Sequence, residues 1–391
     1  MFSPPRQPTG PLLRAGEFCI PVPIRQPEPP GFRPRPDDIS QVTEAPLTHI
    51  STSTARYDGA TPDDLIAHCA EHVAAYDVPF QTTDTALSIQ MPGVLVELQR
   101  DPAGFSARID APDDHSLHQI RETLLYLLDH VCPEAAAGLN WTGTVARDVA
   151  PPNFHLARVR SVTRAAPRFL RVELDCDSTA RMMTGGMHFS LLLPPPGRAP
   201  VWPHNNSNGR TIWPEGDDLL HRAAYTFVDL DPEAGRFTFD VFEHDGGRTT
   251  EWARSAAPGE IVGITGPGGG DFPEGTHILL AGDETALPAI RRILANSEPD
   301  RRGTVLIEIT DSADRCPLPA PAGITVTWIE RASGDSLRDH LAAAPLPPAG
   351  ESRFVWVAAE QALVRWARSH FRQEQQIGRG ECYFSAYWSA D

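Results

Sequence analysis

Three stretches in the C-terminal part of the chain carry residue types that could bind a dinucleotide. The most suggestive runs from His277 to Leu294, where an apolar segment leads through Gly282 into a predicted helix. Glycine permits a tight turn, and the free N–H groups of a helix start can hold a pyrophosphate. Asp283 and Glu284 would repel a phosphate that they faced, so we expect a nicotinamide cofactor to lie against the backbone, Thr285 and Ala286. An ordinary strand-to-helix turn with a capping Thr explains the spacing about equally well.

The second stretch, from His221 to Asp231, places an aromatic residue and a hydroxyl side by side on a predicted strand. Neighbouring side chains on a strand project to opposite faces, so a flavin ring would need the backbone of residues 225–227 as well as one side chain. Arg222 could pair with the pyrophosphate of FAD. Taken alone, the stretch is explained more simply by an exposed Arg near a core Tyr.

The third stretch, from Phe242 to Glu260, has two glycines followed by an Arg and two hydroxyl residues, Arg248, Thr249 and Thr250. These stand at the predicted start of a short helix, a position suited to phosphate oxygens. A capped helix without a ligand is the alternative interpretation.

The elements around these stretches are of two kinds. Between Pro151 and Gly270, apolar and polar residues alternate, as in 170–174 and 237–241, which is typical of half-buried antiparallel strands. After Gly270, apolar runs alternate with helical segments, which indicates a parallel sheet of βαβ units. We therefore expect an antiparallel β-barrel at 151–270 and a doubly wound α/β domain at 274–391. A barrel followed by such a sheet is a known way to hold a flavin against a nicotinamide, so the first would be the FAD-binding domain and the second the NAD(P)H-binding domain.

The N-terminal part has a different composition. Residues 1–48 are rich in Pro and polar residues, so we expect a disordered segment. Residues 49–143 predict a small α+β domain with a helix starting at Thr61, two or three strands between residues 87 and 109, and a helix at 117–131. His68 and His72 lie four residues apart, a spacing that can bind a metal ion. We favour surface or packing histidines, because the helix lacks the Glu of an HExxH motif.

Composition disfavours several classes of function. The 391 residues are 41% apolar, enough for two or three cores, and no run approaches the roughly 18 apolar residues of a membrane span. A formal charge of -17 argues against nucleic acid or anionic lipid as a partner. The six cysteines are scattered and show no disulfide framework, zinc or iron–sulfur pattern. We expect a cytoplasmic protein, since the start of the chain also lacks the layout of a secretory signal.

The sequence resembles the siderophore-interacting proteins, which are ferric-siderophore reductases related to the ferredoxin-reductase superfamily. The similarity covers about Asn153 to the C-terminus, and GDETALPAI at 282–290 is its most specific part. The other matching positions are Tyr225-Thr226, His244, Trp252-Ala253, Gly266-Pro267-Gly268, Trp356 to Glu360 and Tyr387-Trp388. Residues 49–143 resemble a small domain of unknown function that is sometimes fused to such reductases.

Some motif positions depart from the family pattern. Arg222 lies one residue before the usual Arg, where this chain has Ala223, and Val228 replaces a second Arg. The other departures are Asp245 for Gly, Arg248-Thr249-Thr250 for Pro-Ala-Ser, Ala359 for Gly and Ser389 for Arg. Arg248 would supply the phosphate partner that the shifted Arg no longer provides.

The resemblance implies an FAD-dependent oxidoreductase that reduces ferric siderophore iron with NADPH or NADH and releases ferrous iron. It implies no acid–base catalytic residue and no resident metal, and we expect a monomer or a weak homodimer. The expected cofactor-binding residues are Arg222, Tyr225, Thr226, Phe227, His244, Gly247, Arg248, Thr249, Thr250, Trp252, Gly282, Asp283, Glu284, Thr285, Ala286, Tyr387 and Trp388. Two alternatives stay open: a flavin or ferric reductase that serves another acceptor, such as a partner monooxygenase, and a non-enzymatic protein that binds siderophore or flavin.

Overall fold

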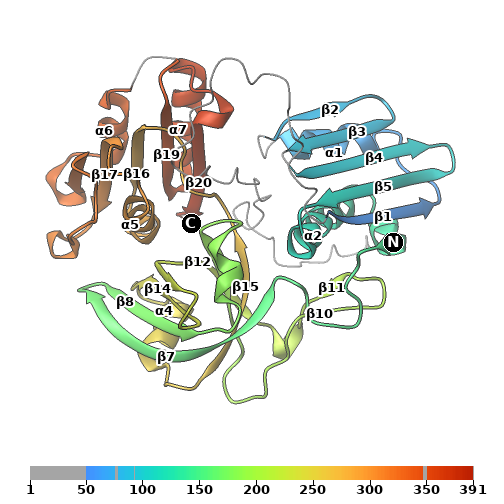
Figure 1. Ribbon diagram of the computed structural model, residues 1–391, viewed down its shortest axis with the longest axis horizontal. Helices are drawn as coiled ribbons and strands as arrows, with labels where there is room; N and C mark the ends of the chain where they lie inside the picture. Colours follow the sequence, from blue (N-terminus) through green and yellow to red (C-terminus); the bar gives the residue numbers. More distant parts are fainter. Residues whose placement is uncertain (1–49, 75–77, 92, 347–349, 391) are drawn as a thin grey trace, which may run out of the picture.

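The computed structural model describes residues 50–74, 78–91, 93–346 and 350–390. The segment 1–48, which the sequence predicts to be disordered, lies outside the described residues. The described residues form three large sheets and one short hairpin. In Figure 1 the N-terminal sheet is at the upper right, the barrel-like sheet lies below, and the C-terminal parallel sheet is at the upper left.

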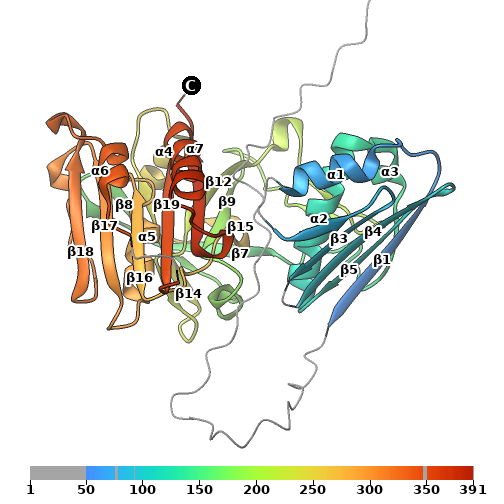
Figure 2. The ribbon, with the colours of Figure 1, turned by 90° about the horizontal axis from the view of Figure 1, so that it is seen from above.

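The N-terminal sheet is antiparallel, with the strand order β2-β3-β4-β5-β1-β6. Its strands are β1 (Ser51–Asp58), β2 (Phe80–Thr82), β3 (Ala86–Met91), β4 (Val94–Asp101), β5 (Gly104–Ala111) and β6 (Asn140–Gly143). Helices α1 (Leu65–Ala74), α2 (Asp114–Val131) and α3 (Pro133–Gly138) cover one face of this sheet (Figure 2). The three strands and two helices expected from periodicity are confirmed, whereas β1, β2, β6 and α3 were not predicted.

The start of the first helix differs from the prediction. Helix α1 begins at Leu65, and the Thr61 hydroxyl, expected to cap it, instead accepts a hydrogen bond from Arg100 Nε at 3.1 Å. Asp63 also pairs with Arg100, at 2.5 Å. A cation from β4 therefore uses the oxygen atoms that were expected to stabilise the helix start, and such a long-range partner leaves no signal in the local sequence.

The middle sheet is an antiparallel, barrel-like sheet with the strand order β12-β9-β15-β7-β8-β14-β13. Its strands are β7 (Phe154–Ala166), β8 (Phe169–Asp175), β9 (His188–Leu193), β12 (His221–Thr226), β13 (Asp229–Asp231), β14 (Arg236–Phe242) and β15 (Ile261–Gly268). Helix α4 (Arg248–Ser255) follows β14. The alternation that predicted β8 and β14 reflects their burial, since every second residue of β8 points into a core of stacked Phe rings.

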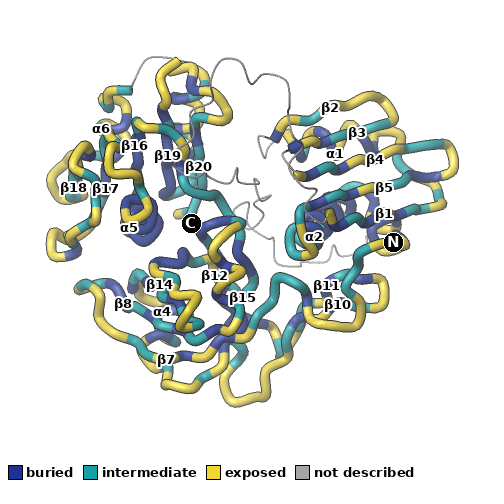
Figure 3. The backbone as a smooth tube through the Cα atoms, in the orientation of Figure 1, coloured by how far each residue is buried: buried dark blue, intermediate teal, exposed yellow. Residues whose placement is uncertain are grey.

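The C-terminal sheet is entirely parallel, with the order β18-β17-β16-β19-β20. Its elements are β16 (His277–Gly282), α5 (Leu287–Ala295), β17 (Arg302–Ile309), β18 (Gly323–Glu330), α6 (Leu337–Ala343), β19 (Arg353–Glu360), α7 (Gln361–Ser369) and β20 (Cys382–Trp388). The central strands β16 and β19 are buried along most of their length (Figure 3). Their residues alternate between two apolar clusters, one containing α5 and the other containing α6 and α7. Burial on both faces explains the continuous apolar runs.

A short hairpin, β10 (His204–Asn205) with β11 (Thr211–Ile212), joins the barrel to the N-terminal sheet through helix α2. Arg121 of α2 is 1% exposed and donates to the carbonyl of Gly209 at 2.7 Å and to His118 Nδ1 at 2.9 Å. His118 Nε2 in turn lies 3.2 Å from the hydroxyl of Thr211. Because these polar groups are buried together, the contact fixes α2 against the hairpin.

The helices of the described residues include none that is long and apolar enough to cross a membrane.

Candidate active site

A cleft with a volume of about 2440 Å³ opens where the three sheets meet. Its lining comes from α2, from the strands β9, β12 and β15 of the barrel, and from the segment after β16 together with α7 and β20. Eight of the residues expected to bind cofactors line this cleft: Arg222, Tyr225, Thr226, His244, Glu284, Thr285, Tyr387 and Trp388. The structure thus brings together residues from all three predicted binding stretches and from the C-terminus.

The other nine expected residues do not line the cleft: Phe227, Gly247, Arg248, Thr249, Thr250, Trp252, Gly282, Asp283 and Ala286. Phe227 is fully buried in the barrel core, where its ring stacks on Phe189 with centroids 4.6 Å apart. Its carbonyl accepts a hydrogen bond from Arg292 at 2.7 Å. The side chain of Phe227 therefore serves the barrel core, and its backbone is already paired.

Strand β12 presents its two candidate side chains in different environments. Tyr225 packs against Phe239 of the barrel core with ring centroids 5.0 Å apart. Burial raises the pKa of Tyr225 to about 12, although a hydrogen bond with Thr249 acts in the opposite direction. Thr226 is 5% exposed and ends the strand at the cleft wall. The phenol of Tyr225 therefore stays neutral at every ordinary pH and can act as a fixed hydrogen-bonding group.

Arg222 lies on the cleft wall with its guanidinium 4.1 Å from the centre of the Trp213 ring. A cation held against the face of an aromatic ring is attracted by the ring electrons, which fixes where its charge lies. Trp213 follows the hairpin that α2 binds, and no sequence motif pointed to it. The stack places a positive charge at the barrel side of the cleft, one strand position away from the residue that carries it in the family pattern.

Helix α4 starts next to the cleft and has no side-chain cap. A side chain at Gly247 would come within 2.7 Å of the His244 ring, so the glycine lets the cleft-lining histidine pack on the helix start. The hydroxyl of Thr249 lies 3.0 Å from His221 Nε2, and that of Thr250 accepts a long hydrogen bond of 3.4 Å from His244 N. An uncapped helix start with N–H groups directed outward suits a phosphate.

The other residues of α4 have separate roles in this structure. Trp252 packs against the barrel core, and its indole N–H donates to Glu260 at 2.8 Å. Arg248 is exposed at the helix start.

The turn after β16 is shaped by close contacts. A Cβ atom at Gly282 would lie 2.4 Å from Cβ of Ala286 and 2.6 Å from the carbonyl of Ala358, so no side chain fits there. Ala286, rather than Thr285, stands at the start of α5, and no side chain caps that helix. Thr285 instead donates from its backbone N–H (2.9 Å) and hydroxyl (2.5 Å) to Asp283 Oδ1. The alternative of a capping Thr is wrong, because the preceding carboxylate accepts both donors.

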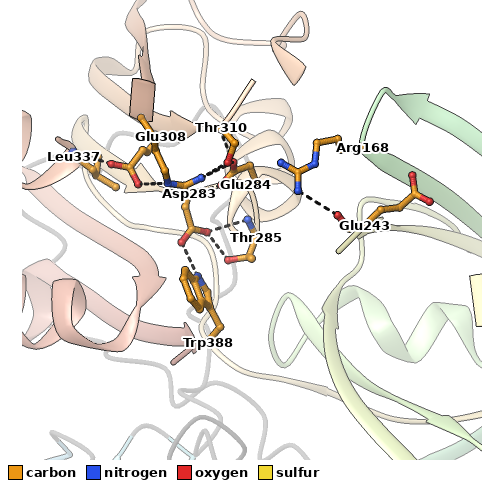
Figure 4. A network of polar contacts seen from close by, with 10 residues as sticks. Arg168, Glu243, Asp283, Glu284, Thr285, Glu308, Thr310, Leu337 and Trp388 are labelled. Carbon is orange, nitrogen blue, oxygen red and sulfur yellow. Dashed lines mark hydrogen bonds and ion pairs between the residues drawn. The ribbon is translucent and has the colours of Figure 1, made fainter. Parts of the chain in front are cut away.

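Asp283 is 2% exposed and turned away from the cleft. Besides the two bonds from Thr285, its carboxylate accepts one from the indole N–H of Trp388 at 2.7 Å (Figure 4). Burial raises the pKa of Asp283, while these hydrogen bonds lower it less strongly. The first acidic residue of the motif therefore anchors the C-terminal tryptophan at the cleft.

Glu284 is also 2% exposed, and a bidentate ion pair with Arg331 compensates its charge, with distances of 2.7 and 2.8 Å. The backbone N–H and hydroxyl of Thr310 donate to the same carboxylate at 2.6 and 2.7 Å (Figure 4). Burial would raise the pKa of Glu284, but the hydrogen bonds from Arg331 and Thr310 outweigh it, and the pKa is lowered. Both motif carboxylates are thus paired within the protein, which reduces the repulsion expected toward a nearby phosphate.

Tyr387 meets a residue that the sequence did not single out. Its hydroxyl lies 2.7 Å from Nε2 of His188, the first residue of β9. Burial lowers the pKa of His188 to about 4, with a smaller contribution from Arg292, so the imidazole is neutral near pH 7. The other ring nitrogen, Nδ1, is buried without a hydrogen-bond partner in the described part of the chain. An orphaned polar atom in the wall of a large cleft is consistent with a site built for a polar ligand.

The histidines of the N-terminal part have packing roles. The ring of His68 stacks on that of His72 with centroids 6.2 Å apart, and the ring of His130 lies tilted to His72 with centroids 6.1 Å apart, while His68 and His130 are both exposed. Within the described ranges, no group of three or more His, Cys, Asp or Glu residues is arranged to hold a metal ion. His118 takes part in the hairpin contact described above.

Two family models match the chain, and their boundaries follow the fold. The siderophore-interacting FAD-binding domain matches residues 158–271, which include most of the barrel, and the siderophore-interacting protein model matches residues 275–391, which hold the parallel sheet. The chain belongs to the siderophore-interacting protein family. Its antiparallel, barrel-like sheet followed by a parallel sheet is the architecture expected from the sequence, so that expectation is confirmed.

Named relatives and solved structures of the family agree with this assignment. The chain is 29% identical over 210 residues to ferric vibriobactin reductase ViuB of Vibrio cholerae, which covers 52% of this chain and 76% of that protein. It is 28% identical over 244 residues to the NADPH-dependent ferric-chelate reductase of Escherichia coli, covering 61% and 93%. The crystal structure of the siderophore-interacting protein SipS from Aeromonas hydrophila superposes with a TM-score of 0.52 at 26% identity, covering 61% of this chain and 92% of that one.

Proposed function

We propose that this chain is an FAD-dependent oxidoreductase that reduces the iron of ferric siderophores with electrons from NADPH or NADH and releases ferrous iron. The observation that supports it most directly is the cleft, where β12 of the barrel faces the end of β16 and the C-terminal strand β20. The barrel and the parallel sheet are the two parts that the family uses for flavin and nicotinamide, and eight of the seventeen expected contact residues, drawn from both parts, line this one cavity.

The reaction depends on how many electrons the nicotinamide, the flavin and the ferric iron each exchange at a time. A flavin held in this cleft would supply the chemistry that connects a two-electron donor, the nicotinamide, with a one-electron acceptor, ferric iron. Siderophore oxygens are hard ligands that hold ferric iron better than ferrous iron, so one-electron reduction loosens the chelate. The side chains of this chain then have to bind, orient and exclude water, and none is required to transfer a proton.

The barrel side of the cleft fits an FAD molecule. We propose that Tyr225 and Thr226, at the end of β12, hold the ring system, since both line the cleft and one is fixed by barrel packing. The uncapped start of α4 at Gly247–Thr250 would hold phosphate oxygens, with Arg222 supplying charge from the Trp213 stack. His244, packed on Gly247, closes this side of the site.

The opposite side fits a nicotinamide cofactor. We propose that the backbone of Gly282–Ala286 and the Thr285 side chain position it, because the two neighbouring carboxylates are paired inside the protein. Trp388, held by Asp283, and Tyr387, held by His188, would limit how the nicotinamide approaches the ring.

The proposal is tested by the absorption spectrum and by the fate of iron. We expect the purified protein to bind FAD stoichiometrically, to oxidise NADPH or NADH when a ferric chelate is present, and to release iron that a ferrous chromogen captures. A colourless protein that takes up no FAD would favour the non-enzymatic alternative. Flavin reduction without faster turnover on ferric chelates would favour a different acceptor.

A matched pair of variants tests the residues. Replacing Thr226 by Ala, or by Val to keep its volume, should lower bound flavin and turnover together. The control is Thr238→Val, which removes a hydroxyl of strand β14 that donates to Asp229 at 3.2 Å and does not line the cleft. Full flavin occupancy and a normal rate in both Thr226 variants would remove this residue from the site.

The proposal extends to the division of the chain into units, its substrate, its location and its assembly. We infer that the chain divides into units at 49–143, 151–270 and 274–391, and the separate apolar cluster of residues between Ala55 and Trp141 supports the first of these. We also infer a ferric siderophore as substrate, no nucleic-acid or membrane partner, a cytoplasmic location, and a monomer or weak homodimer. Sedimentation of the FAD-loaded protein would test the last point.

A further inference from the structure

One wall of the cleft belongs to helix α2, outside the regions that the family models match. Gln119, Glu122, Tyr126 and Asp129 all line the cleft. Their spacing of three and four residues puts them along one face of the helix. The opposite face of α2 is apolar and packs into the N-terminal core, where Leu124 is 4% exposed. Helix α2 therefore has two separate surfaces, and its polar one faces the cavity.

The polar face of α2 is held in place at both of its ends, by Gln119 and by Asp129. Gln119 Nε2 donates to the carbonyl of Pro267 at 2.8 Å, near the end of strand β15. Asp129 forms an ion pair with Arg210 of the hairpin region. Both partners also line the cleft. Together with the buried contacts of Arg121 and His118, these bonds make α2 a fixed wall.

The cleft is more than twice as large as a usual pocket for one ligand. A pocket for one drug-sized ligand usually measures roughly 300–1,000 Å³, whereas this cleft measures about 2440 Å³. The flavin and nicotinamide positions proposed above lie on the barrel and at residues 282–286. Among the described residues, α2 thus lines a part of the cleft that these two positions do not use, and a reductase with this fold needs room for its electron acceptor as a third ligand.

Of the four residues on the polar face of α2, Tyr126 is the one best suited to contact such an acceptor. It is half-buried, and its ring lies edge-on to His130 with centroids 4.4 Å apart, so its position is fixed. The large aromatic ring of a tyrosine can pack against an apolar part of a ligand. Resting on the proposed ferric reductase function, we propose that α2 of the N-terminal unit forms the acceptor-facing wall of the cleft and that Tyr126 is a specificity residue that contacts bulky ferric chelates.

The inference is tested on the full FAD-loaded protein with two kinds of acceptor. Ferric vibriobactin and ferrioxamine B serve as bulky chelates, and ferricyanide serves as a compact one-electron acceptor. Quenching of tryptophan fluorescence gives the Kd of each chelate, and steady-state kinetics give KM and kcat. In Tyr126→Ala we expect the chelate Kd and KM to rise about tenfold, as for loss of a well-packed aromatic contact. Flavin content, kcat and the kinetics with ferricyanide should stay as in the wild type.

Two further variants separate contact from structure. Tyr126→Phe keeps the ring and should stay within about threefold of the wild type, since it loses at most one hydrogen bond. Glu97→Ala alters an exposed residue of β4 in the same unit that does not line the cleft, and should leave every value unchanged. If Tyr126→Ala lowers the thermal midpoint, Tyr126→Leu replaces it, because leucine retains most of the buried volume.

The outcomes are distinct. Equal chelate Kd values for the wild type and the folded Tyr126→Ala or Tyr126→Leu variant would overturn the inference and leave the proposed function standing. A wild type that binds a chelate without reducing it would refute the proposed function, while the Kd comparison would still decide on Tyr126. A wild type that binds neither chelate would refute both.

Discussion

The ion pair between Glu284 and Arg331 provides a quantitative test of how this structure neutralises the acidic pair next to the proposed nicotinamide site. The perturbation is Arg331→Met, which removes the cation and keeps much of its apolar volume. It leaves Glu284, whose side chain is 3% exposed, without its bidentate partner.

The magnitude follows from what remains around the carboxylate. Breaking a buried ion pair by removing one partner costs about 3–5 kcal/mol. Thr310 still donates two hydrogen bonds to Glu284, and the Arg331 side chain is 36% exposed, so the pair is only partly desolvated. We therefore expect the lower end of the range, a loss of about 3 kcal/mol in the free energy of unfolding at pH 7.

The pH dependence of the stability difference between the wild type and Arg331→Met gives a second, independent test. In the wild type the pKa of Glu284 is lowered, so its contribution to stability is present above the unfolded value of about 4.3 and is lost as the pH falls below it. In Arg331→Met, burial dominates, and we expect the native pKa to lie above the unfolded value. The native variant then binds a proton more readily than its unfolded state, and its deficit relative to the wild type should shrink between pH 7 and pH 5.

Urea unfolding followed by tryptophan fluorescence at pH 7 and pH 5 measures both effects. The matched control is Arg315→Met, which breaks an ion pair of 2.5 Å with Glu330, whose two side chains are 47% and 35% exposed. Such a surface pair should contribute less than about 1 kcal/mol. The reasoning is refuted if Arg331→Met costs no more than this control at pH 7, or if its deficit grows on acidification.

Two more predictions concern buried polar groups. Asp283→Asn replaces an oxygen that accepts the indole N–H of Trp388. We expect acrylamide to quench the tryptophan fluorescence of this variant more strongly, and nicotinamide to bind more weakly at unchanged FAD content. Identical quenching in the wild type and the variant would show that the bond does not hold Trp388. Burial lowers the pKa of His118 to about 3, so on acidification this histidine gains a proton in the unfolded chain before it does so in the folded protein. The free energy of unfolding should therefore fall as the pH drops below about 6.5, by about 2 kcal/mol at pH 5. Urea midpoints should show a flatter profile over that range in His118→Gln than in the wild type, and parallel profiles would contradict the assignment.

Local periodicity predicted those elements whose burial follows a simple repeat. Strands β8 and β14 alternate because one face of each lies in the barrel core, and β16 is a continuous apolar run because both of its faces are buried. The edge strands lacked such a signal. Strand β20 has only two buried residues, Cys382 and Phe384, and its remaining side chains are partly or fully exposed. Its sequence therefore lacks the repeat of apolar residues that would predict a strand.

The candidate site could be predicted only in outline. The glycines and hydroxyl residues of the predicted binding stretches lie in backbone turns and at helix starts, which local sequence determines, and the two matched family models span the regions that contain them. Trp213 and His188 were missed, because each meets its partner, Arg222 or Tyr387, through the fold rather than through a motif.

The sequence by itself determined the succession of an α+β, an antiparallel and a parallel part, the family, and the segment from Gly282 to Ile290 at the junction of strand and helix. Only the tertiary structure decided where the side chains of that segment point. Asp283 turns toward Trp388, 105 residues away, and Glu284 toward Arg331, 47 residues away. It likewise decided that α2 walls the cleft. Contacts between residues so distant in the chain depend on how sheets pack, and no local repeat of residue types encodes them.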